Sequence, residues 1–275
     1  MQKIRPAMVA GMFYSAQKAQ LDRDIALYLE HAHDLKIEGE ILGLIAPHAG
    51  YMYSAQVAAG AYRQLIDRNI DTVAVISPSH REYFREISVY DGFAYETPFG
   101  YVPIDRERTN ELAEMSDQII LSEKGHRYEE HALEVQLPLL QKAIGSFQLI
   151  AVVIGDQNQE NIDDLATGLA VILKEQKCLI VASSDLSHFY HSDKARVLDK
   201  TVCDDVEKFD ENGLWGHLNS GVCEMCGGGP VIATMKACRL LGADKSKVIQ
   251  YRTSGDVTGD YNEVVGYLSA VFYKS

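Results

Sequence analysis

The sequence has no hydrophobic run that approaches the roughly 18 residues needed to cross a bilayer, and its first residues lead into no signal-peptide pattern. We therefore expect a cytoplasmic protein without membrane segments. Basic residues are also scarce, because 26 Lys and Arg stand against 39 Asp and Glu and give a formal net charge of −13. No Lys/Arg cluster stands out that could follow a phosphate backbone, which makes nucleic acid a poor candidate partner.

Cysteines are few, and all lie in the second half of the chain: Cys178, Cys203, Cys223, Cys226 and Cys238. An odd number at irregular spacing, without a signal peptide, indicates reduced thiols rather than a disulfide framework. The pair Cys223-x-x-Cys226 could be half of a structural zinc site, but no second Cys-x-x-Cys or spaced histidine pair follows it. A redox Cys-x-x-Cys is the other reading, although there the first cysteine normally opens the helix, and here the second does.

Apolar runs alternate with segments of helical period, which is typical of a mostly parallel sheet flanked by helices. The expected strands are 41–46, 72–77, 149–154, 178–183 and 264–272, and the expected helices are 21–31, 54–66, 106–115, 129–143, 161–175, 194–209 and 230–241. Residues 86–105 instead alternate β-branched and aromatic side chains with Gly and Pro, which predicts antiparallel strands at a sheet edge. We predict one α/β domain over residues 1–275 with a mixed, mostly parallel central sheet.

Titratable side chains follow three of the expected strands where each strand ends. His48 follows the first, His80 the second, and Asp185 and His188 the fourth. In open α/β sheets ligands bind outside the carboxyl ends of the strands, so these groups are expected to meet. A single loop histidine is usually an ordinary hydrogen-bonded residue, but three at one sheet edge favour a metal site, because neutral imidazole suits Fe, Cu, Zn and Ni.

The third ligand has several candidates: Asp185, Glu224 and the cysteines of G-V-C-E-M-C-G-G-G-P. Cys226 stands out because it precedes an expected helix, whose unpaired N–H groups and positive dipole end would favour a thiolate. Asp185 also lies close to His188 in S-S-D-L-S-H, where a carboxylate could fix the imidazole tautomer of a general base. We predict Asp185 and His188 as the catalytic pair.

The segment R-Y-E-E-H-A-L-E-V-Q-L-P-L-L, residues 127–140, is expected to form most of an amphipathic helix. Glu130 and Glu134 would share one face of it, and such charges usually lie on a solvated face. The alternative is that Glu130 or His131 points into the strand-end pocket, where it would orient a metal ligand or bind a substrate.

Taken together, these motifs resemble the Memo (mediator of cell motility) family, whose bacterial and archaeal members are called AmmeMemoRadiSam system protein B. The resemblance runs nearly end to end and rests on R-P-A-M-V-A-G-M-F-Y, I-A-P-H-A-G-Y-M-Y-S, S-P-S-H, E-H-A-L-E-V-Q-L-P, S-S-D-L-S-H, C-G-G-G-P and Y-L-S-A-V-F. It implies a fold similar to the catalytic subunit of class III extradiol dioxygenases. Those non-haem iron enzymes hold Fe(II) with two histidines and a glutamate, and use a further histidine as acid/base.

Carried over by motif, the family's metal ligands fall on His48, His80 and Cys226, with Asp185 and His188 lining the same pocket. The resemblance also implies iron or copper as the cofactor, redox chemistry, and a radical-SAM protein with a small companion protein as partners. In animals it implies binding of phosphotyrosine-containing receptor peptides. A thiolate in place of the carboxylate favours copper or zinc over oxygen-activating Fe(II), which argues against ring cleavage.

Two functions compete. The first is a metal-dependent redox or metal-handling protein, and thus a candidate oxidoreductase. The second is a non-catalytic binding module whose cleft captures a peptide or a protein, with Tyr51, Tyr53 and Phe189 as exposed aromatic anchors. An intact extradiol dioxygenase would require Glu224, rather than Cys226, to turn inward.

Overall fold

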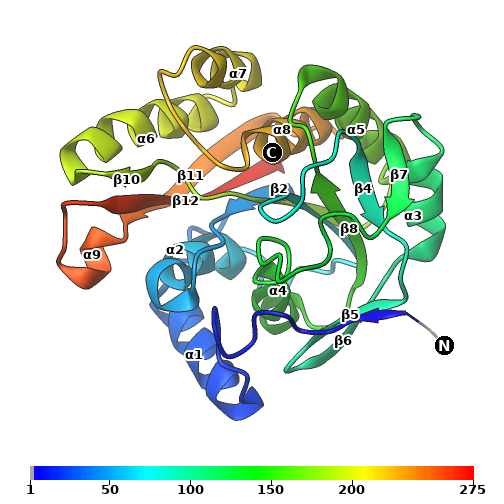
Figure 1. The fold of residues 1–275 in the computed structure, drawn as a ribbon, viewed down its shortest axis with the longest axis horizontal. Helices are drawn as coiled ribbons and strands as arrows, with labels where there is room; N and C mark the ends of the chain where they lie inside the picture. Colours follow the sequence, from blue (N-terminus) through cyan, green and yellow to red (C-terminus); the bar gives the residue numbers. More distant parts are fainter. Residues whose placement is uncertain (1–2) are drawn as a thin grey trace.

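A mixed nine-stranded sheet forms the centre of the computed structural model, which describes residues 3–275 (Figure 1). Along the main path its strands follow the order β10-β12-β2-β9-β3-β8-β4-β7, and β11 pairs with β12. The bounds are β2 (Glu40–Ala46), β3 (Thr72–Pro78), β4 (Ile87–Tyr90), β7 (Ile119–Ser122), β8 (Gln148–Ile154), β9 (Cys178–Ser183), β10 (His188–Tyr190), β11 (Lys245–Thr253) and β12 (Val264–Lys274). Strands β2, β9, β3 and β8 run parallel to one another, and β12 and β4 flank them in the opposite direction.

The four parallel strands are apolar along their length because both faces of the sheet are covered. Alternate residues of each strand belong to two different hydrophobic clusters, one on each face, as the two-residue period of a strand requires. Helices α1 (Lys18–His31), α2 (Tyr51–Arg63) and α4 (Gln136–Ile144) cover one face. The other carries α3 (Arg106–Ala113), α5 (Gln159–Ile172), α6 (Ser192–Glu207), α7 (Glu211–Asn219) and α8 (Gly228–Leu240), while the short α9 (Gly255–Thr258) precedes β12 (Figure 1).

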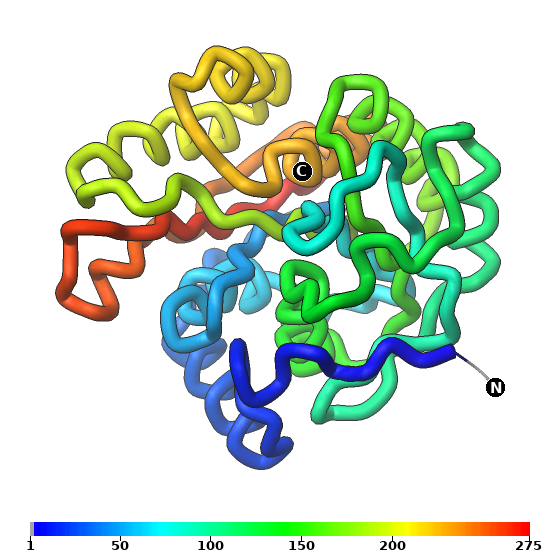
Figure 2. Tube along the Cα trace, in the orientation of Figure 1, coloured from blue at the N-terminus to red at the C-terminus, as the bar shows by residue number. Residues whose placement is uncertain are grey.

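A second, three-stranded sheet contains the N-terminal strand β1 (Ile4–Arg5). It pairs in parallel with β5 (Ala94–Thr97), which forms an antiparallel hairpin with β6 (Gly100–Pro103). Figure 2 shows the N-terminal segment running beside this hairpin and then turning toward α2. The segment 86–105 was expected to form antiparallel strands, and it does, but only β4 joins the central sheet while β5 and β6 form the separate one.

The predicted fold class is confirmed: an α/β architecture with a mixed central sheet that is parallel at its centre. Several elements were not predicted: the strands β1, β7, β10 and β11 and the helices α7 and α9. Within residues 3–275, no helix combines the length and the apolar character that a membrane crossing would need.

The helix expected at 129–143 is wrong in its first half, because α4 begins only at Gln136. Residues 127–135 form turns instead, and Tyr128 (φ 54°) and Glu129 (φ 60°) have left-handed backbone conformations. Glu130 and Glu134 do not share a solvated face either, since both are buried. The leucines at helical spacing are buried as expected, but the two carboxylates bind buried partners from other segments: Glu134 binds Arg5, and Glu130 binds His80.

Candidate metal centre

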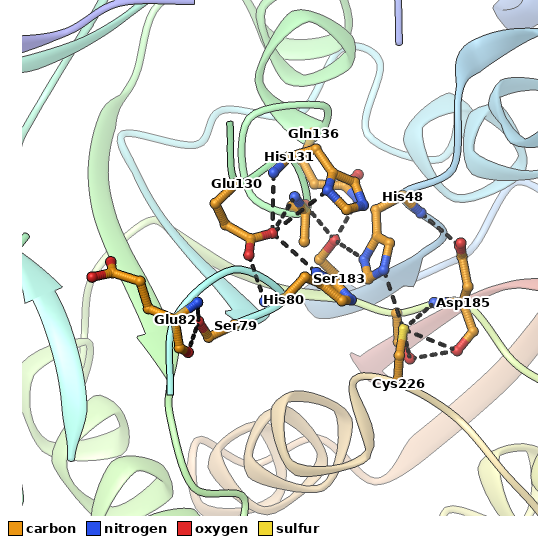
Figure 3. Close-up of polar contacts among 12 residues, drawn as sticks. His48, Ser79, His80, Glu82, Glu130, His131, Gln136, Ser183, Asp185 and Cys226 are labelled. Atoms are coloured by element: carbon orange, nitrogen blue, oxygen red, sulfur yellow. Dashed lines mark hydrogen bonds and ion pairs between the residues drawn. The ribbon is translucent and has the colours of Figure 1, made fainter. Parts of the chain in front are cut away.

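The parallel strands bring His48, His80 and Cys226 together at the carboxyl end of the sheet. His48 follows β2, His80 follows β3, and Cys226 precedes the first turn of α8. Metal-ligating atoms of the three side chains all lie within 4.8 Å of one another, and Cys226 Sγ is 3.1 Å from His48 Nε2. Figure 3 shows the three side chains pointing toward one another. The predicted convergence of these residues is confirmed.

His48 has a fixed tautomer because of Ser183. The Ser183 hydroxyl donates to the Ala132 carbonyl at 2.6 Å, so its oxygen must accept from His48 Nδ1, which lies 2.9 Å away. The lone pair of His48 Nε2 therefore faces Cys226. Burial, followed by the neighbouring His80, lowers the pKa of His48 to about 3, and a neutral imidazole is the form that binds metal.

His80 is held in the same way, by Glu130. The carboxylate accepts from His80 Nδ1 at 3.0 Å and from the His80 backbone N–H at 2.5 Å, and it also accepts from the N–H groups of His131 and Ala132. Burial alone would raise the pKa of Glu130, but the hydrogen bonds from the His80 ring and backbone outweigh it and lower the pKa to about 2. Since an ionised carboxylate only accepts hydrogen bonds, His80 Nδ1 carries a proton, and in the neutral imidazole Nε2 is the nitrogen left for a metal.

Cys226 is held from both sides of its loop. Its Sγ receives the Asp185 backbone N–H at 3.3 Å, and its carbonyl accepts from Gln157 Nε2 at 2.8 Å. Burial and then the charge of Asp185 raise the pKa of the thiol to about 12, so the expectation of a thiolate favoured by the helix terminus is wrong. The N–H of Gly227 is already bonded to Ser184 Oγ, and burial dominates. A bound cation would have to displace the thiol proton.

The predicted pairing of Asp185 with His188 is not found. Asp185 accepts the His48 backbone N–H at 2.8 Å, and no hydrogen bond joins it to His188 within residues 3–275. His188 lies in the short strand β10 with its ring against Phe189, 5.6 Å between centroids. Burial raises the pKa of Asp185 to about 6, against the hydrogen bond from His48. Asp185 therefore fixes the His48 backbone rather than the His188 tautomer.

Glu224 does not compete for the third ligand position. Its side chain is exposed and accepts the Tyr190 hydroxyl at 2.6 Å, whereas Cys226 two residues later turns inward. The cysteine thus completes the group of candidate ligands.

His131 lines the pocket, as one of the two readings of its segment predicted. Its ring lies between Phe13 and His80, with centroid distances of 4.5 and 4.8 Å, and it is 5.4 Å from the His48 ring. Burial, followed by the neighbouring imidazole of His48, lowers its pKa to about 3. Its Nδ1 is 3.7 Å from Glu130 Oε1, too far for a hydrogen bond, and has no other partner in residues 3–275.

The donor set fits a transition metal. Two imidazole nitrogens with their lone pairs directed inward and one sulfur are the ligands that copper, zinc and iron accept, and three protein ligands leave coordination positions open. Ser183 and Gln157 were not identified from the sequence. Ser183 could be suspected only as the last residue of its strand, and Gln157 carries no sequence signal.

Comparison with known proteins gives consistent matches over almost the whole chain. A family model described as "Memo-like protein" matches residues 5–271. The chain is 38% identical to MEMO1 family protein MTH_45 of Methanothermobacter thermautotrophicus, over 96% of this chain and 98% of that protein. It is 35% identical to a MEMO1 family protein of Aquifex aeolicus, over 98% and 99% of the two chains.

A solved structure shares the fold at low sequence identity. The uncharacterized protein JW3007 from Escherichia coli K12 superimposes with a TM-score of 0.52 and 12% identity, covering 84% of this chain and 99% of the other. This likeness supports the expected α/β fold and, at this identity, says nothing about activity.

Proposed function

The chain belongs to the Memo-like family, and from this membership and the geometry of the strand-end cluster we propose a metal-dependent redox or metal-handling protein that binds iron or copper. The ligands are His48, His80 and Cys226. One observation carries the proposal: three donor atoms from three separate segments lie within 4.8 Å, and both imidazoles are held with Nδ1 protonated.

The protein's own residues prepare the site for a metal. A bound iron or copper ion would supply one-electron redox chemistry. Ser183 and Glu130 hold Nδ1 of the two imidazoles and so orient both rings before a metal enters. The His80 side chain is 29% exposed, which leaves a route from solvent to the open coordination positions. His131 lies close enough to contact a molecule bound there, with its ring 5.4 Å from that of His48 and 4.8 Å from that of His80.

Ring cleavage is not included in the proposal. In this chain the inward-facing third ligand is the sulfur of Cys226, and the nearby carboxylate of Glu224 points to solvent. Sulfur is a softer and more easily oxidised ligand than a carboxylate, so the site lacks the two-histidine-one-carboxylate set of oxygen-activating iron enzymes.

Metal content tests the proposal directly. Tag-free protein purified anaerobically without chelator, and again after reconstitution with Fe(II) or Cu(I), is analysed by inductively coupled plasma mass spectrometry. We expect near-stoichiometric metal in the wild type and loss of it in His48→Ala, His80→Ala and Cys226→Ala. His31→Ala, at the end of α1, and Cys203→Ala, in α6, are matched controls that should retain it. Full metal content in both histidine ligand variants would refute the proposal.

A binding cleft is the second candidate. Tyr83, in the loop that carries His80, and Phe189, next to His188 in β10, are 82% and 70% exposed, as expected for aromatic anchors. Tyr51, by contrast, is buried and donates to the Val135 carbonyl, so its expected exposure is wrong. On the resemblance we propose a radical-SAM protein and its small companion as partners. Co-purification that is unchanged by metal removal but lost in a Tyr83→Ala/Phe189→Ala variant would favour this candidate.

A further inference from the structure

A buried arginine near the N-terminus holds the segment that orients His80. Arg5 in β1 is 4% exposed, and its guanidinium donates to three places in that segment. Nε donates to the His126 carbonyl at 2.7 Å, Nη2 to the Glu130 carbonyl at 2.6 Å, and Nη1 to Glu134 Oε2 at 2.5 Å. A residue more than 120 positions away in sequence therefore fixes both ends and the middle of the segment 126–134.

This segment requires an external anchor. Between the two carbonyls that Arg5 binds, Tyr128 and Glu129 are consecutive non-glycine residues with left-handed backbones, at φ 54° and 60°. Such residues rarely adopt this conformation, and it persists where surrounding contacts impose it. The two left-handed residues come directly before Glu130, whose carboxylate meets His80.

The other side of the anchor is equally buried. Glu134 is fully buried, and besides Arg5 it accepts the backbone N–H groups of Met8 and Val9 and the hydroxyl of Tyr14. A charged pair taken out of water needs such additional hydrogen bonds to be tolerated. The N-terminal residues 5–14 and the segment 126–134 are thereby joined into one unit beside the histidines.

The contacts form an unbroken chain from Arg5 to the candidate ligand. The guanidinium holds the Glu130 backbone, and the Glu130 carboxylate holds both the backbone N–H and Nδ1 of His80. His80 Nε2 is not engaged by Glu130, and the His80 ring lies 5.1 Å from that of His48. We propose that Arg5 is a positioning residue of the metal centre, which acts through the turn at 126–130 to fix the tautomer and orientation of His80. Its effect on metal affinity rests on the proposed function, whereas its effect on the tautomer does not.

Arg5→Lys tests the proposal because lysine keeps the charge beside Glu134 but cannot donate from a rigid fork to several separate acceptors. Arg68→Lys is the matched control. Arg68 also donates to three backbone carbonyls, those of Gln64, Gly39 and Ile37, but beside the amino end of β2, the end opposite to His48.

The first readout is the tautomer of His80 in the metal-free protein, from long-range ¹H–¹⁵N correlation spectra of the imidazoles. We expect a single Nδ1–H tautomer in the wild type and in Arg68→Lys, and a mixture in Arg5→Lys. A purely structural Arg5 would lower the melting temperature and leave this signature unchanged. A folded Arg5→Lys protein with the wild-type tautomer of His80 therefore overturns the proposal.

The second readout is the affinity for Co(II), followed through the thiolate-to-cobalt absorption band in competition with a chelator. Residues that orient metal ligands typically change affinity by about 10- to 100-fold, so Arg5→Lys should bind at least about tenfold more weakly at unchanged stoichiometry. Equal affinity in Arg5→Lys and Arg68→Lys would contradict the proposal. If the wild type takes up no Co(II), the proposed function fails, and the tautomer comparison still decides the role of Arg5.

A second variant serves if Arg5→Lys does not fold. Glu129 is exposed, and Glu129→Gly relieves the left-handed strain without touching the carboxylate that binds His80. Arg5→Lys/Glu129→Gly should fold and still show the mixed tautomer, because Glu130 has lost its anchor, whereas Glu129→Gly alone should not. A single wild-type tautomer in the double variant overturns the proposal.

Discussion

Replacing Ser183 with alanine should weaken metal binding through His48 without removing a ligand. Ser183 Oγ is the acceptor for His48 Nδ1, and its own proton goes to the Ala132 carbonyl. It also accepts Gln136 Nε2 at 2.8 Å. Alanine leaves the ring without the acceptor that selects its tautomer, so the imidazole can rotate or place its proton on Nε2, the nitrogen that faces Cys226.

The size of the effect follows from the hydrogen bonds that alanine cannot make. Loss of a residue that orients a metal-bound histidine typically costs about 10- to 100-fold in affinity, or about 1.4 to 2.7 kcal/mol. The free energy of unfolding should fall as well, because a buried group left without its hydrogen-bond partner costs about 1–3 kcal/mol. The Ala132 carbonyl and His48 Nδ1 both lose Ser183 as a partner, while Gln136 Nε2 retains the Pro47 carbonyl at 3.0 Å, so the destabilisation should lie within that range.

The assay is a chelator competition with Co(II) or Zn(II), paired with urea unfolding of the metal-free protein. Ser77→Ala is the matched control, since Ser77 lies in the adjacent strand β3, is equally buried, and has no hydrogen-bond partner for Oγ in residues 3–275. We expect an affinity loss in Ser183→Ala alone. Equal metal affinity in the two variants would refute the tautomer argument, even if Ser183→Ala were less stable.

Two further predictions concern pH and thiol reactivity. The pKa of Glu130 is about 2 in the folded protein and near 4.5 when unfolded, so its contribution to stability is complete above about pH 4.5 and is lost as the pH falls toward 2. Urea unfolding should therefore show a steeper loss of stability between about pH 5 and 3 in the wild type than in Glu130→Gln, and parallel profiles would contradict this. Burial and Asp185 raise the pKa of Cys226 to about 12, so iodoacetamide should modify it only slowly at about pH 8 in the folded, metal-free protein. The rate is followed by mass spectrometry in folded protein and in urea. Equal rates of Cys226 modification in the two would contradict a buried, protonated thiol.

The candidate metal ligands could be predicted from the sequence, whereas only some of the residues that orient them could. His48 and His80 each follow an apolar strand, and the rule that such strand ends meet is independent of side-chain detail. The segment 127–135 was misread because Leu133 fits a helical period with Leu137 and Leu140, whereas its carbonyls are held by Arg5, a partner too distant in sequence for any local pattern to reveal. The pairing of Asp185 with His188 failed for a related reason, since the carboxylate is used by the His48 backbone.

The strands bring the two candidate histidine ligands together, and one irregular segment orients both of their rings. Glu130 orients His80 directly, and the Ala132 carbonyl orients His48 through Ser183. Gln136 then fixes Ser183 and receives the hydroxyl of Tyr62 from α2. A regular helix through this region would have used the Ala132 carbonyl for its own ladder and turned Glu130 away from His80. The left-handed turn at Tyr128 and Glu129 therefore allows one segment to orient the imidazoles of both His48 and His80. Variants that convert this turn to helix should weaken metal binding by both histidines at once.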